Sequence, residues 1–104
     1  MKPYGVHVNI WKAILNVCFR YPQVSKVILY GSRARGDFKP GSDIDIAIDA
    51  PVMTSTQFSV LWNALDELPL VYSLDIVHLQ DLKNPTLLEA IKQDGIVMEK
   101  KTYS

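Results

Sequence analysis

Charged and apolar residues alternate between positions 43 and 48, where the sequence reads DIDIAI. Successive side chains of a β-strand point to opposite faces, so this pattern predicts a half-buried strand with its isoleucines on the inner face. Asp43 and Asp45 then share the outer face, about 6–7 Å apart along the strand. Carboxylates this close repel each other unless a cation lies between them, and Mg²⁺ prefers oxygen ligands that it shares with substrate phosphates. The strand therefore predicts a metal–nucleotide site.

A second motif precedes this strand. The apolar run Val24–Tyr30 predicts a buried strand, and it ends at Gly31-Ser32. Glycine would let the backbone approach a triphosphate closely, so that the amides that follow could face its oxygens while the Ser32 hydroxyl donates to a phosphate. Arg33 or Arg35 would pair with the phosphates through a planar guanidinium, and Arg33 is favoured because it directly follows Ser32.

The rest of the chain predicts an alternation of helices and strands. Helical spacing, capping residues and β-branched runs predict the following elements. They are a helix over 8–20, a strand over 24–30, a short helical turn over 33–36, a strand over 43–49, a helix from the Thr54 cap to Leu68, a strand over 74–79, a helix from Asn84-Pro85 to Gly95 and a strand over 96–99. This order predicts an α/β (α+β) fold, with a three- or four-stranded mixed sheet. We expect helices mainly on one face, with the other face left for the acidic cluster.

Composition narrows the class of protein. A chain of 104 residues, 48% hydrophobic and 21% charged, predicts one globular domain over residues 1–104. The formal net charge is zero, so we expect neither direct nucleic-acid binding nor attraction to an anionic membrane. No apolar run approaches the ~20 residues of a membrane span, and the first residues lack a signal-peptide pattern. These features favour a cytoplasmic location.

The sequence GSRARGDFKPGSDIDIAI at positions 31–48 resembles the signature of nucleotidyltransferases of the DNA polymerase β superfamily: Gly-Ser, a spacer, then Asp-x-Asp. Ten residues separate Ser32 from Asp43. The GSRARG opening and Ser42 are most similar to the minimal nucleotidyltransferases of prokaryotes, the MntA-type antitoxins that accompany HEPN-domain RNases. The later run LDIV at 74–77 fits the third acidic strand of the family and supplies Asp75.

The resemblance implies a small palm-like fold with ATP as substrate. Asp43, Asp45 and Asp75 would be catalytic and would hold two Mg²⁺ ions about 3.5–4 Å apart. Gly31, Ser32, Arg33 and Arg35 would then bind the nucleotide.

The resemblance also implies a reaction and a partner. AMP from ATP would be placed on a hydroxyl, a tyrosine near the RNase site of a cognate HEPN toxin, which makes the chain a type VII-like antitoxin that modifies and binds its toxin. We expect no residues for an additional specificity domain after the strand over 96–99, and therefore an acceptor site that is shallow or is completed by a second protein.

Two alternatives stay open. One is an adenylyltransferase acting on a small hydroxyl compound such as an aminoglycoside, which would need no protein partner. The other is a non-catalytic antitoxin that neutralises by binding alone, in which Asp43→Ala and Asp45→Ala would leave neutralisation intact.

Overall fold

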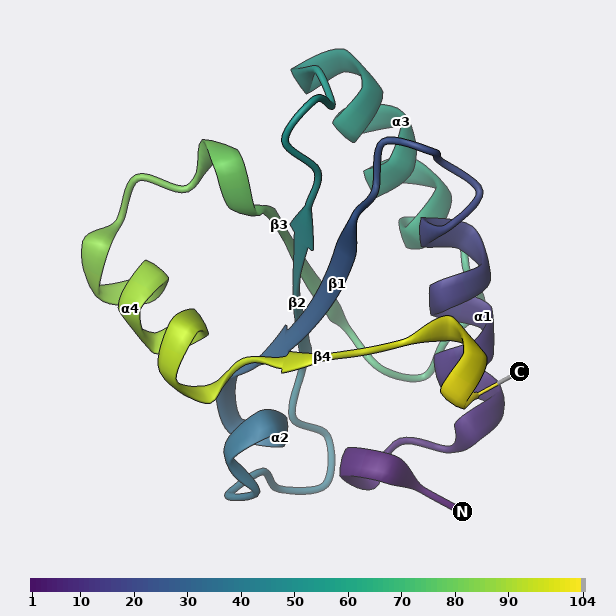
Figure 1. Ribbon diagram of the computed structural model, residues 1–104. Coiled ribbons are helices and arrows are strands. Elements are labelled where there is room, and N and C mark those ends of the chain that lie inside the picture. Colours follow the sequence, from purple (N-terminus) through teal and green to yellow (C-terminus); the bar gives the residue numbers. More distant parts are fainter. Residues whose placement is uncertain (104) are drawn as a thin grey trace.

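The computed structural model describes residues 1–103. Across these residues the chain forms four α-helices and one four-stranded mixed sheet (Figure 1). In chain order the elements are η1 (Pro3–Gly5), α1 (Val8–Cys18), β1 (Lys26–Tyr30), α2 (Gly31–Arg35), β2 (Ile44–Asp49), α3 (Ser55–Asp66), β3 (Leu74–His78), η2 (Leu79–Asp81), α4 (Pro85–Asp94), β4 (Ile96–Val97) and η3 (Lys100–Thr102). The predicted fold class and the order of its elements are confirmed. Ser104, the last residue of the expected domain, lies outside the described part.

The sheet has the strand order β3-β2-β1-β4. β1 pairs antiparallel with β2 and with β4, whereas β2 pairs parallel with β3. In this register Asp45 is opposite Tyr30 on one side and opposite Asp75 on the other. The pairing of β2 with β3 extends to the backbone before β3, because the amide of Ile44 donates to the carbonyl of Ser73 at 2.9 Å.

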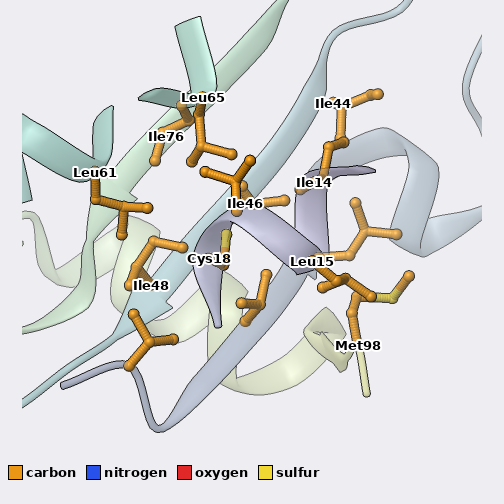
Figure 2. Packing of buried hydrophobic residues seen from close by; sticks show 14 of the residues in the cluster. Ile14, Leu15, Cys18, Ile44, Ile46, Ile48, Leu61, Leu65, Ile76 and Met98 are labelled. Atoms are coloured by element: carbon orange, nitrogen blue, oxygen red, sulfur yellow. The ribbon is translucent and has the colours of Figure 1, made fainter. Parts of the chain in front are cut away.

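α1 and α3 cover one face of the sheet and enclose the main core (Figures 1 and 2). The inward isoleucines Ile44, Ile46 and Ile48 are fully buried there, as the alternating pattern predicts. Burying a side chain of this size stabilises the fold by roughly 1.5–3 kcal/mol. α3 begins with the predicted capping box, in which the Thr54 side chain accepts from the amide of Gln57 and the Gln57 side chain accepts from the amide of Thr54.

α4 packs on the opposite face, which we expected to be left to the acidic residues. Its Ile91 lies in a small second core with Tyr30 and Ala47. Ala47 is the smallest residue on the outer face of β2, so the helix can approach the sheet closely there. As predicted, Asn84 caps this helix by accepting from the amides of Thr86 and Leu87. α4 therefore shares the outer face with the acidic residues, and it lies on the other side of the sheet from α1 in Figure 1.

The strands are shorter than the sequence predicts. β2 begins at Ile44, so Asp43 lies just before the strand rather than within it. β4 comprises only Ile96–Val97. Within residues 1–103, no helix has both the length and the apolar character needed to cross a lipid bilayer.

Candidate functional site

Gly31 joins the two sequence motifs in space. It has a φ of +74°, in the left-handed region that side chains disfavour. A Cβ added here would collide with Oδ2 of Asp45 and lie 3.1 Å from its Cγ. Glycine is therefore required at position 31 for two reasons: the backbone conformation disfavours a side chain, and the Asp45 carboxylate fills the space that a side chain would need. The turn that precedes the half-buried Ser32 consequently lies directly beside Asp45.

Asp45 and Asp75 form the centre of the acidic site. They are opposite each other in the parallel β2–β3 pair, and Asp75 lies close enough to Asp45 to raise its pKa. Burial, followed by the charges of Asp75 and Asp43, raises the pKa of Asp45 from 3.8 to about 6, and the positive charge of Arg35 opposes this rise. Negative charge is therefore crowded at the end of the sheet where β2 and β3 begin.

Of the three predicted carboxylates, two are paired across the sheet and the third lies outside it. The structure places Asp45 opposite Asp75 in the β2–β3 ladder, whereas Asp43 lies just before β2 and acts on Asp45 through its charge. Among residues 1–103, no group of three or more His, Cys, Asp or Glu side chains is arranged so that it could hold a metal ion. The donor chemistry nevertheless fits a divalent cation, because all three groups are carboxylates, and a cation would relieve the repulsion that raises the pKa of Asp45.

The preference for Arg33 as a phosphate ligand is wrong. Its side chain is only 1% exposed. Its Nη1 donates to the carbonyl of Tyr4 at 2.9 Å, and its Nε and Nη2 donate to the carbonyl of Ser42 at 3.2 and 2.8 Å. A guanidinium enclosed in this way cannot also reach a bound phosphate. Spacing places an arginine after Ser32 but does not show into which side of the turn it points.

Arg35 is the arginine beside the acidic site. Its side chain is 45% exposed, and its Nε pairs with Asp37 at 3.3 Å. An ion pair this exposed contributes little to stability, so the guanidinium can exchange partners easily. Its positive charge lies close enough to Asp45 to oppose the rise in the pKa of that carboxyl.

Tyr30 is a neighbour of the site that the motifs do not reveal. Burial, then the charges of Asp75 and Asp45, raises its pKa to about 12, so the hydroxyl stays protonated in the presence of both carboxylates. The alternation of side chains along β1 could have predicted this neighbour, because it places Tyr30 on the same sheet face as Asp45.

Paired aspartates beside a Gly-Ser turn, on a small mixed sheet, define a nucleotidyltransferase. Residues 12–103 match the family described as Polymerase beta, Nucleotidyltransferase, and the chain belongs to that family. No curated protein matches its sequence significantly.

Solved structures share the fold. A toxin–antitoxin crystallised with AMP-PNP has a TM-score of 0.62 at 22% identity, over 94% of this chain and 78% of that one. A protein from Sulfolobus solfataricus, predicted to be a nucleotidyltransferase, has a TM-score of 0.59 at 22% identity, over 91% and 81%. A mutant of the toxin–antitoxin MntA–HpeT has a TM-score of 0.59 at 19% identity, over 94% and 78%.

Proposed function

We propose that this chain, as a single domain over residues 1–104, is an antitoxin that transfers AMP from ATP to a tyrosine hydroxyl of a cognate HEPN-type RNase toxin in the cytoplasm. The observation that carries the proposal is the contact of Gly31 with Asp45, which is itself paired with Asp75. This contact places a turn suited to phosphates against an acidic pair suited to cations.

The comparisons support this direction. Two of the similar structures are toxin–antitoxin assemblies, and one of them was crystallised with AMP-PNP, an ATP analogue. The mutant assembly has two aspartates, two positions apart, replaced by glutamate. Asp43 and Asp45 have the same spacing.

In the proposed reaction the tyrosine hydroxyl releases its proton to solvent as its oxygen attacks the α-phosphorus of ATP, and pyrophosphate leaves with the electrons of the broken P–O bond. Two Mg²⁺ ions, held by Asp43, Asp45 and Asp75, would supply charge stabilisation for the attacking and leaving oxygens. Gly31 and Ser32 bind the triphosphate, and Arg35 exchanges Asp37 for a phosphate oxygen. Asp75 is exposed, and in this scheme it would complete the site of the ion nearer the acceptor.

The test is the intact mass of the partner. The toxin encoded beside this chain is incubated with it, ATP and Mg²⁺, and its mass should rise by one or more adenylate units. Asp45→Asn and Asp75→Asn should each lower the rate at least about 10²-fold, the scale for loss of one preorganised electrostatic group.

The same experiment separates the alternatives. A toxin that is neutralised without any gain in mass, also by Asp45→Asn, would establish binding alone and contradict the proposed chemistry. Adenylation of an aminoglycoside by the free chain, with no change in the toxin, would establish the small-molecule activity instead.

A further inference from the structure

The guanidinium of Arg33 is buried without an acidic partner. No carboxylate within residues 1–103 pairs with it, and its hydrogen-bond acceptors are two backbone carbonyls, of Tyr4 and Ser42. Withdrawing an arginine from water is costly unless its donors and its charge are both satisfied. A fold that places a charge here must satisfy it through the groups that surround it.

Two aromatic rings provide that surrounding. The Arg33 guanidinium carbon lies 4.8 Å from the centroid of the Phe38 ring and 5.0 Å from that of the Tyr72 ring. A cation over the face of an aromatic ring is attracted by the negative charge of that face, more strongly when water is excluded. The two rings come from different connections, that between α2 and β2 and that between α3 and β3.

These contacts converge on the residues that lead into the acidic site. Ser42 immediately precedes Asp43, and Tyr72 lies three residues before Asp75. The Arg33 guanidinium thus contacts both the connection before Asp43 and the connection before Asp75. Arg33 also belongs to α2, the short helix that begins at the Gly31 turn beside Asp45.

The N-terminal turn η1 closes the same cluster. Tyr4, whose carbonyl accepts from Arg33, has a φ of +56°, which is unusual for a residue other than glycine. A Cβ on Gly5 would lie 2.8 Å from Nη1 of Arg33 and 2.6 Å from Cζ of Phe38. The backbone of η1 is therefore packed directly against the guanidinium and the first ring.

We propose that Arg33 is a positioning residue that fixes the loop carrying Asp43 relative to the segment carrying Asp75, so that both carboxylates can serve one cation–nucleotide complex. This inference rests on the proposed function for its purpose. Its structural content, the coupling of two connections by one guanidinium, can be tested without activity.

Lysine cannot replace this arrangement. An ammonium is a compact point charge, whereas the guanidinium donates to both carbonyls while its central carbon lies over two rings. Arg33→Lys therefore keeps the charge but loses the simultaneous contacts. We expect the loop over residues 36–43 to loosen in this variant while the rest of the sheet stays paired.

The first measurement is amide hydrogen exchange. The amide of Ser42 donates to the Lys39 carbonyl and that of Ile44 to the Ser73 carbonyl, so they report on the loop and on its link to the segment before β3. In Arg33→Lys both amides should exchange at least about 10-fold faster, because this region opens locally, while amides of β1 keep their rates. Unchanged rates at Ser42 and Ile44 would overturn the inference.

The second measurement is the Mg²⁺ concentration needed for half-maximal binding of fluorescent ATP. Loss of a group that orients metal ligands costs about 10- to 100-fold in affinity, and we expect a rise in this range for Arg33→Lys. Leu61→Ala is the control, because Leu61 is a fully buried residue of α3. It should lower thermal stability while leaving the Mg²⁺ requirement unchanged. An equal rise in both variants would reduce Arg33 to a general stabilising residue and overturn the inference.

Tyr72 offers a matched pair in case Arg33 variants fold poorly. Tyr72→Phe keeps the ring face and loses only the long 3.4 Å hydrogen bond to the Gly5 carbonyl, so both measurements should stay near the wild-type values. Tyr72→Leu removes the ring face and should shift both in the direction of Arg33→Lys. If Tyr72→Leu leaves both unchanged, the inference is wrong.

Failure of the proposed function would be a different result. Wild-type protein would then bind no ATP with Mg²⁺, while the comparison of amide exchange rates between wild type and Arg33→Lys would still test the inference.

Discussion

Gly31 and Asp45 are in contact across the β1–β2 pair, with the carboxylate occupying the space that a side chain at position 31 would fill. The two sequence motifs are therefore a single packed unit. A side chain at position 31 would displace the Asp45 carboxylate, which makes this contact the sharpest place to test the site.

Gly31→Ala should fold less stably and lose most of its activity. The positive φ costs about 1–2 kcal/mol for a residue with a Cβ, and the collision with Asp45 adds about 1–3 kcal/mol of overpacking. Displacement of the carboxylate should lower AMP transfer by roughly 100-fold. Thermal unfolding and the initial rate of transfer measure the two effects.

Gly36→Ala is the matched control for this variant. Gly36 has a φ of +92°, but a Cβ there would meet no heavy atom within 4 Å. It should show the strain without the collision, and so retain near-normal activity in the folded protein. Equal loss of activity in both variants would mean that the contact with Asp45 has no special role.

The pH dependence of stability should reveal the crowded carboxylates. The pKa of Asp45 is raised on folding, from 3.8 to about 6, so the folded state holds this proton more tightly. The resulting stabilisation is complete below pH 3.8 and is lost as the pH rises through 6. Without divalent cations, the free energy of unfolding of Asp45→Asn at pH 7.5 should therefore exceed that of wild type by about 1 kcal/mol, after allowance for solvent screening. At pH 4 the two proteins should melt at nearly the same temperature.

Mg²⁺ should reverse this difference. Ligand that binds only the folded state raises its stability, so Mg²⁺ with ATP should raise the melting temperature of wild type more than that of Asp45→Asn. Asp66→Asn, on α3 and across the sheet, serves as the control and should respond as wild type does. A melting temperature of Asp45→Asn that follows wild type at every pH would show that the acidic pair is not crowded in solution.

The cap of α4 should contribute measurably to stability. Asn84 accepts from two amides of the first turn, so Asn84→Ala should cost about 1 kcal/mol in the free energy of unfolding. Asn84→Asp keeps an acceptor oxygen and should stay within a few tenths of wild type. Urea denaturation of the three proteins decides the question, and equal midpoints for alanine and asparagine would show that the cap is not formed.

Much of the acidic site was accessible from the sequence. Alternation at positions 43–48 correctly assigned the isoleucines to the core and Asp45 to the outer face, and the register then brought Asp75 beside it. The start of β2 could not be predicted from this alternation, because it depends on pairing with the neighbouring strand, which begins at Ile44 opposite Leu74. Asp43 therefore lies just before the strand, where it is exposed.

Two further features depend on tertiary contacts that local patterns do not encode. Periodicity shows which face of a helix is apolar but not which sheet face it covers, and the second apolar face that accepts α4 is built from three different strands. The role of Arg33 depends on Tyr4, Phe38 and Tyr72, which lie far apart in sequence. Its burial could not be predicted from its place after Ser32.

The position of α4 has a consequence for any molecule that must reach the acidic pair. The helix packs against Tyr30 and Ala47 on the outer sheet face, so it covers part of the approach over the strands. Access remains end-on, from the rim at which β2 and β3 start, near α2 at the bottom of Figure 1. A protruding acceptor, carried on a loop or a chain terminus, suits such an entrance better than a flat surface does.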